Sequence, residues 1–206
     1  MMRIFALEEP LNQLTEELAG LVEAACAAPT NAFGYGIWSH HVTQVVANGR
    51  RLAPLFGADA EIVELAALLH DYASIYDAAL YPEHQIHSAR VAGELLGARG
   101  YPGERIVAVQ HCIETHRGSM SAQRHTAEAV CLANADALAH IQQVPSLLYL
   151  AYVQRQMSID AGAAWVAKKL ERTWRKLDPQ VQELARPEYA AAVGVLEIGY
   201  RGSGGR

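Results

Sequence analysis

Helix-type segments separated by glycine and proline make up nearly the whole sequence, and this pattern limits the possible fold more than any other feature. Alanine, leucine and glutamate, which favour helices, dominate these segments. No run alternates between apolar and polar residues as a half-buried strand does. We therefore expect an all-α fold with a loop at 72–83, and with helices at about residues 10–28, 37–55, 57–71, 83–100, 101–118, 126–141, 146–157, 158–177 and 179–198.

The chain is expected to form one domain. Its 206 residues can bury one good core, and the sequence contains no internal repeat and no linker long enough to separate two domains. We therefore predict a single all-α domain over residues 1–200. The glycine-rich end, residues 201–206, is predicted to be a flexible tail.

Charge and cysteine usage limit the partners and the compartment. The net charge of −5 disfavours nucleic acid and anionic membranes, which bind basic surfaces. No apolar run approaches the roughly 20 residues of a membrane span, and the acidic N-terminal segment does not resemble a signal peptide. Three cysteines without a CxxC spacing favour a reducing compartment. We therefore expect a cytoplasmic protein that binds neither nucleic acid nor membrane.

One apolar segment ends in two polar residues. The run Leu65-Ala66-Ala67-Leu68-Leu69 is followed directly by His70 and Asp71, and burying such a pair costs free energy unless it is partnered. Coordination of a metal ion is one interaction that would offset this cost. Because neighbouring side chains on a helix diverge by about 100°, the pair can converge on one ion only where the helix ends or the aspartate reaches across.

The nine histidines of the chain are distributed over the predicted helices. A histidine beside apolar residues occurs in each of five segments, which contain His41; His70; His84 and His87; His111 and His116; and His140. A single such residue is usually a hydrogen-bonded histidine at the edge of the core. Five together, with Asp71 and Asp136, indicate a metal site built between helices, because imidazole and carboxylate groups bind Mn, Fe, Co, Ni and Zn.

Five stretches resemble the HD-domain superfamily of metal-dependent phosphohydrolases in order and spacing. They are WSHHVTQVV, AALLHDYA, HQIHSARVAGELL, QHCIETHR and ANADALAHI, and they cover about residues 36–142. The resemblance implies a compact helical HD-domain bundle, followed here by additional C-terminal helices. It also implies that His41, His70, Asp71 and Asp136 hold one metal ion. Gln44 stands where the HxxRV motif of the family often has arginine.

Many members of this superfamily hold a second ion, with the aspartate of the HD pair as a bridge. By the spacing of the HxxxGA motif, His84 is the leading additional ligand, and His87 lies one turn later as a substrate-binding candidate. His111 and His116 are both candidate ligands. They differ by about 140° around a helix, and helical position favours His111 as the ligand, with His116 nearer the mouth of the site.

The resemblance implies hydrolysis of a phosphate ester, most naturally of a nucleotide or another small phosphorylated metabolite, by water activated on one or two divalent transition-metal ions. Asp71, His84 and Arg117 are the predicted catalytic residues. Substrate phosphate is expected to contact Arg117, His116, His87 and a lysine of the segment WVAKKLERTW, Lys168 or more specifically Lys169.

Three other interpretations are open. The same histidines would suit a mixed-valent di-iron oxygenase of the HD type, and the fold could also serve as a non-catalytic metal-binding regulatory module. Cys112 beside His111 could form a nucleophilic pair, although a buried structural thiol is commoner. Trp165 and Trp174, nine residues apart, could contribute to a homodimer face or to the helical core.

Overall fold

The computed structural model describes residues 13–117 and 123–201, and within these ranges it contains helices and no strand. This confirms the expected all-α class. The α-helices are α1 (Gln13–Ala27), α2 (Thr43–Phe56), α3 (Ala60–Leu69), α4 (Tyr72–Tyr76), α5 (His84–Gly97), α6 (Gly103–Thr115), α7 (Ala127–Gln142), α8 (Val144–Tyr149), α9 (Ile159–Lys176) and α10 (Pro179–Arg201). Two π-helical turns, η1 (Trp38–Val42) and η3 (Leu150–Gln154), and a 3₁₀ helix, η2 (Ala78–Glu83), lie between them.

Three helices begin directly after a residue whose side chain caps the helix N-terminus. The Asp59 carboxylate accepts hydrogen bonds from the amides of Glu61 and Ile62 at the start of α3. Thr126 and Ser158 cap α7 and α9 in the same way. Such caps satisfy amides that have no partner inside the helix.

The segment 72–83 was expected to be a loop, and this expectation was wrong. It forms α4 and η2, because Asp77 ends the first helix and its carboxylate accepts a hydrogen bond from the Ala79 amide at the start of the second. Ala73 and Ile75 of α4 are buried in the core. Helices of five or six residues are too short to show a periodic apolar pattern in the sequence.

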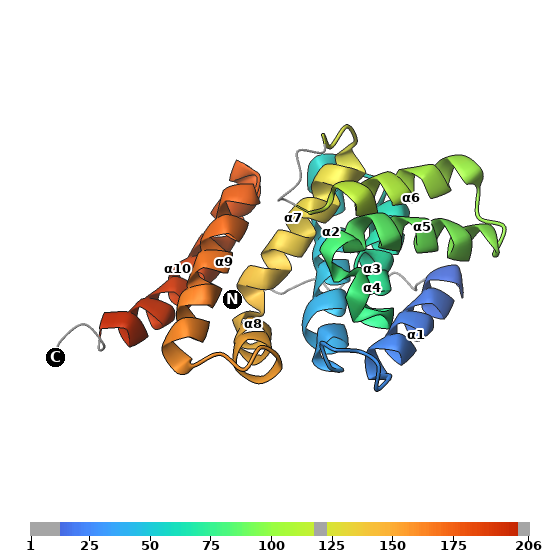
Figure 1. The fold of residues 1–206 in the computed structure, drawn as a ribbon. Coiled ribbons are helices and arrows are strands. Elements are labelled where there is room, and N and C mark those ends of the chain that lie inside the picture. The colour runs from blue at the N-terminus through green and yellow to red at the C-terminus, as the bar shows by residue number, and fades with distance from the viewer. Residues whose placement is uncertain (1–12, 118–122, 202–206) are drawn as a thin grey trace.

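Helix α7 lies at the centre of the molecule. It packs against α2, α3 and α6 and, on another side, against α9 and α10. Figure 1 shows α9 and α10 side by side on one flank of α7, with α5 and α6 on the other. Residues of α7 from Cys131 to Ala139 are buried, so this stretch of the helix is enclosed by the surrounding helices.

The two tryptophans of α9 pack within the chain. Trp174 stacks on Tyr189 of α10 with ring centroids 4.2 Å apart, and the Arg155 guanidinium lies over the Trp165 ring at 4.6 Å. These contacts account for both rings without a second subunit, and a homodimer stays a prediction.

The predicted tail at 201–206 falls almost entirely outside the described residues. Within them, no helix combines the length and the apolar character needed to cross a bilayer.

Candidate metal centre

The end of α3 allows His70 and Asp71 to face the same point. The helix ends at Leu69, His70 keeps helical dihedral angles, and Asp71 leaves them with φ −108° and ψ 2° before α4 begins. This turn places His70 Nε2 3.3 Å from Asp71 Oδ2. The adjacent pair therefore converges because the helix stops between them.

Two other elements complete the first half of the site. His41 comes from the π-helical turn η1, a helix type that is often found at functional sites. Its Nε2 lies 3.1 Å from His70 Nε2 and 3.4 Å from Asp71 Oδ2. Asp136 of α7 contributes Oδ1 at 3.7 Å from His41 Nε2. The structure thus brings together His41, His70, Asp71 and Asp136, the four residues that the resemblance implied for one ion.

The other oxygen of Asp71 faces a second pair of histidines. Asp71 Oδ1 lies 3.2 Å from His84 Nε2 and 3.9 Å from His116 Nε2, and the two imidazole nitrogens are 3.4 Å apart. His84 is the first residue of α5, and His116 directly follows α6. One carboxylate therefore connects two groups of nitrogen atoms, one at each oxygen.

Backbone carbonyls determine which ring nitrogen of three histidines carries the proton. His70 Nδ1 lies 2.8 Å from the Ala67 carbonyl oxygen, and the same i−3 contact occurs at His84 with Tyr81 (2.9 Å) and at His116 with Ile113 (2.6 Å). A carbonyl oxygen only accepts, so Nδ1 donates in each case. In the neutral rings the Nε2 lone pairs are left to point into the cluster.

This arrangement fits a bound cation. Asp71 Oδ1, His84 Nε2 and His116 Nε2 are three acceptors that face one another, and with both rings neutral none of them supplies a donor. His84 and His116 are also buried. Imidazole nitrogens held by a second hydrogen bond, together with a carboxylate, are the usual ligands of divalent transition metals. The donor set therefore fits one ion at each oxygen of Asp71.

Burial and neighbouring charges shift the pKa values of the cluster. Burial lowers the pKa of His116 to about 4, which keeps this ring neutral. Burial also acts to lower the pKa of His70, but the Asp71 and Asp136 carboxylates outweigh it and raise the pKa to about 9. Burial acts to raise the pKa of Asp71, yet His70 and His41 hold it well below its usual range. His70 therefore carries a proton at neutral pH in the metal-free protein.

Metal binding at neutral pH should release a proton, because a ligand imidazole must be neutral. His70 holds that proton below about pH 9, so apparent metal affinity should rise as the pH increases towards 9. Calorimetric titration of the metal-free protein with Mn²⁺, in buffers of different ionisation enthalpy, measures the number of protons released. About one proton per His70-bound ion is expected at pH 7, and the absence of any release would contradict this protonation pattern.

His140 joins the cluster, although sequence reasoning gave it no role beyond facing inwards. Its Nε2 lies 3.4 Å from Asp136 Oδ1, and its ring stacks on that of His41 with centroids 4.8 Å apart. His41, Asp136 and His140 form a third group with converging ligand atoms. The sequence did contain a signal, because His140 follows Asp136 by four residues and therefore lies on the same face of a helix.

Three predicted residues are not brought to the cluster. His111 Nε2 lies 3.4 Å from the His125 amide, and the two rings stack 5.9 Å apart. The structure therefore places His116 at the cluster and His111 away from it, because the end of α6 turns His116 inwards and leaves His111 on another face. His87, one turn further along α5, is half-buried and does not line the cavity described below. Cys112 is fully buried, and its burial raises the thiol pKa to about 12, which disfavours a nucleophilic role.

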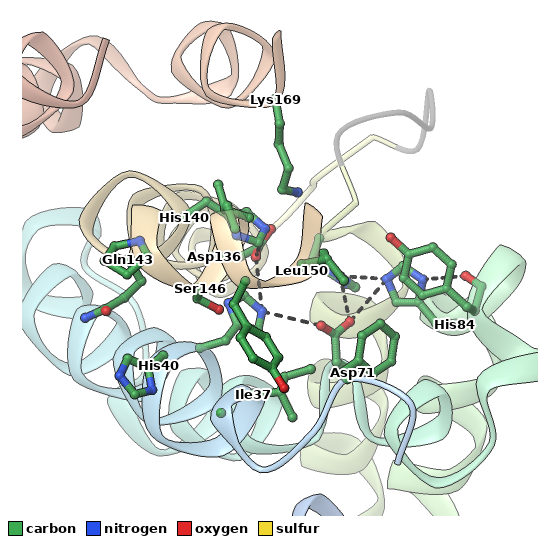
Figure 2. Close-up of a pocket in the computed structure, with 18 of the residues that line it drawn as sticks. Ile37, His40, Asp71, His84, Asp136, His140, Gln143, Ser146, Leu150 and Lys169 are labelled. Atoms are coloured by element: carbon green, nitrogen blue, oxygen red, sulfur yellow. Dashed lines mark hydrogen bonds and ion pairs between the residues drawn. The ribbon is translucent and has the colours of Figure 1, made fainter. Parts of the chain in front are cut away.

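A cavity of about 600 Å³ opens onto the cluster. Three cationic side chains line it, namely Arg117 on the His116 side and Lys169 and Lys176 of α9 on the Asp136 side. Figure 2 shows Lys169 extending from α9 towards Asp136 and His140. The rest of the wall is largely aromatic and aliphatic: Phe33, Tyr35, Ile37, Tyr81, Leu147, Tyr149 and Leu150.

Of the lysines of α9, two line the cavity and one faces solvent. Lys168 is exposed, whereas Lys169 lines the cavity, and burial lowers the Lys169 pKa to about 8. Lys176, which sequence reasoning missed, places Nζ 3.9 Å from Asp136 Oδ2. The sequence could have indicated Lys176, because it follows Lys169 by seven residues and therefore lies two helical turns along the same face of the helix.

Comparison with known proteins identifies the family. The family model of the HD domain matches residues 38–141, half of the chain. The chain belongs to the HD-domain family. This membership confirms the resemblance drawn from the sequence motifs. No match was found among functionally curated proteins.

Solved structures with the same fold cover nearly the whole chain. A predicted HD superfamily hydrolase from an uncultured Thermotogales bacterium is 20% identical, with a TM-score of 0.60, and the match covers 92% of each chain. Bacillus subtilis YpgQ, solved in complex with ADP, is 17% identical with a TM-score of 0.65, covering 93% of this chain and 98% of YpgQ. A Lactobacillus plantarum protein is 16% identical with a TM-score of 0.68, and the match covers 93% of this chain and 97% of that protein. Their similarity extends the fold match beyond the HD domain into the C-terminal helices.

Proposed function

We propose that this protein is a metal-dependent phosphohydrolase that cleaves a phosphate ester of a nucleotide or another small phosphorylated metabolite. One observation carries the proposal: both oxygens of Asp71 face imidazole nitrogens, inside a cavity that also contains three cationic side chains. A carboxylate shared by two ligand groups suits a pair of divalent ions, and the cationic side chains suit an anionic substrate.

In such a reaction, the residues of the cluster would serve as metal ligands. His41, His70, Asp71 and Asp136 would hold one ion, and His84 and His116 with the other oxygen of Asp71 would hold a second. Bound divalent ions supply a water of lowered pKa and stabilise negative charge on a phosphoryl group. Asp71 and His84 thus act in catalysis as ligands.

Arg117 would bind and orient phosphate oxygens. Its guanidinium donates to the Pro82 carbonyl and to Gln85 Oε1 at 3.4 Å, contacts that hold the side chain at the cavity wall with donors to spare. Lys169 and Lys176 would hold phosphate oxygens from the opposite wall. The substrate phosphate is therefore expected between these cationic groups, above Asp71.

The cavity is large enough for a nucleotide. Small-molecule sites typically measure about 300–1,000 Å³, and this one measures about 600 Å³. Its aromatic wall offers Tyr35 and Tyr149, both partly exposed, as surfaces on which a planar ring can stack. The ADP in the YpgQ complex, a protein of the same fold, also supports a nucleotide.

Phosphate release from a panel of esters tests the proposal. Metal-free protein is loaded separately with Mn²⁺, Co²⁺, Ni²⁺ or Fe²⁺ and assayed on p-nitrophenyl phosphate, bis-p-nitrophenyl phosphate and nucleoside mono-, di- and triphosphates. We expect metal-dependent phosphate release from at least one ester. Oxygen consumption by the iron-loaded protein without phosphate release would favour the oxygenase alternative. Metal binding with neither activity would favour a regulatory module.

Substrate binding should weaken at alkaline pH because of Lys169. Only the protonated amine attracts phosphate, and a pKa of about 8 means that the charge is lost as the pH rises through 8. We expect KM to rise about tenfold between pH 7 and 9, which corresponds to one lost charge-assisted contact. Lys169→Arg keeps its charge over this range and should flatten the rise. The exposed neighbour Lys168→Arg is the matched control and should leave the profile unchanged; an identical profile in Lys169→Arg would contradict this role.

A further inference from the structure

A row of four side-chain amides connects the core between α2 and α7 with the cavity. Asn48 Nδ2 donates to Gln142 Oε1 at 2.9 Å and to the Ala135 carbonyl at 3.3 Å. Gln44 Nε2 donates to Asn48 Oδ1 at 3.4 Å, and Gln143 Nε2 donates to Gln44 Oε1 at 3.2 Å. Of these residues, Gln143 lines the cavity.

The Ala135 carbonyl fixes the direction of the whole row. An amide side chain can normally be turned end for end, but a backbone carbonyl only accepts, so the nitrogen of the buried Asn48 must face it. Asn48 Oδ1 then faces Gln44 and requires a donor, which turns Gln44 Oε1 towards Gln143. The Gln143 amide nitrogen must therefore face Gln44 Oε1 and donate to it.

The carbonyl oxygen of Gln143 is therefore the free end of the row. Among the described residues, no donor reaches Gln143 Oε1, and the side chain lies half-buried at the cavity wall together with His40 and Ser146 (Figure 2). An oriented acceptor at this place favours a ligand that presents an N–H group and disfavours one that presents a carbonyl oxygen.

We propose that Gln143 is a specificity-determining residue that accepts a hydrogen bond from an amino-bearing nucleobase, and that Gln44 is the positioning residue that sets its orientation. This inference rests on the proposed function, because it takes the nucleotide phosphate to lie at Asp71 and the base to lie in the aromatic part of the same cavity. Adenine is the simplest base of this class, and hypoxanthine carries a carbonyl oxygen in place of its amino group.

Two substitutions of Gln44 test whether this residue sets the orientation of the Gln143 amide or only packs against it. Glutamate at this position only accepts, so Gln44→Glu loses the donor to Asn48 Oδ1 but keeps the Gln143 nitrogen turned towards residue 44 and the Gln143 acceptor in the cavity. Arginine only donates, so Gln44→Arg forces Gln143 to turn its oxygen towards residue 44 and its amide nitrogen into the cavity. Because Gln44 does not line the cavity, both effects must pass through Gln143.

The test compares adenosine and inosine 5′-phosphates, as mono-, di- and triphosphates, on the manganese-loaded protein. Kd from calorimetry and kcat/KM from phosphate release are both measured. For the wild type and Gln44→Glu we expect the adenosine compound to be preferred by about tenfold, the value of one hydrogen bond of about 1.4 kcal/mol. In Gln143→Leu the ratio should fall to about one, and in Gln44→Arg it should reverse.

The outcomes distinguish this inference from the proposed function. A wild-type preference that persists unchanged in Gln143→Leu and Gln44→Arg would overturn the inference while leaving the phosphohydrolase in place. Hydrolysis of other esters without any binding of nucleotides would overturn the inference alone as well. The expected pattern of Kd ratios without hydrolysis would support the inference and contradict the proposed function.

Discussion

Asp71→Ala should abolish both metal binding and hydrolysis. Its two carboxylate oxygens lie 3.2–3.4 Å from nitrogens of His41, His70 and His84, so its removal takes a ligand from both predicted ions at once. Because such ions contribute several kcal/mol to transition-state stabilisation, turnover should fall by roughly a thousandfold or more.

The fold should survive this substitution. Asp71 makes no side-chain cap and belongs to the cluster rather than to the apolar core, so far-ultraviolet circular dichroism should be unchanged. Asp160→Ala, at an exposed position near the start of α9, is the matched control and should keep full metal content and activity. Full metal content in Asp71→Ala would show that the site is elsewhere.

His84→Ala should lower the metal stoichiometry from two ions per chain to one. His84 Nε2 lies near one oxygen of Asp71 and near His116 Nε2, on the side away from His41 and Asp136. The ion held by those latter residues should therefore remain. His116→Ala should give the same stoichiometry, because its nitrogen belongs to the same ligand group.

Each of these two histidines has a histidine control nearby, on α5 or α6. His87→Ala on α5 and His111→Ala on α6 remove the same ring at sites outside the cluster, and both should retain two ions. If His111→Ala lost an ion and His116→Ala did not, the arrangement of α6 described above would be contradicted. If His84→Ala retained two, the second ion would not lie at Asp71 Oδ1.

The helical class and most of the residues that gather in the cluster could be predicted from the sequence, because helix signals and the HD motif are local. His70 and Asp71 stand out as polar residues after an apolar run, and a family spacing relates them to His41 and Asp136. The short helices α4 and η2 could not be predicted, since five or six residues carry no periodicity.

The choice between His111 and His116 depends on how α6 is rotated against its neighbours, which spacing along one helix does not determine. His116 lies beyond the last turn of α6 and is fixed by its bond to the Ile113 carbonyl. The cavity could not be predicted from the sequence either, because it also depends on how the helices pack against one another. Arg117, which follows α6, and Lys176 of α9 both line it, although they are distant in the sequence.

Metal content per chain tests the central claim most directly. Protein purified without chelator or immobilised nickel is equilibrated with Mn²⁺, separated from free metal, and measured by elemental mass spectrometry beside Asp71→Ala. The proposed centre predicts about two equivalents in the wild type and none in the variant. No bound metal in the wild type, after equilibration with Mn²⁺, Co²⁺ or Ni²⁺, would contradict it.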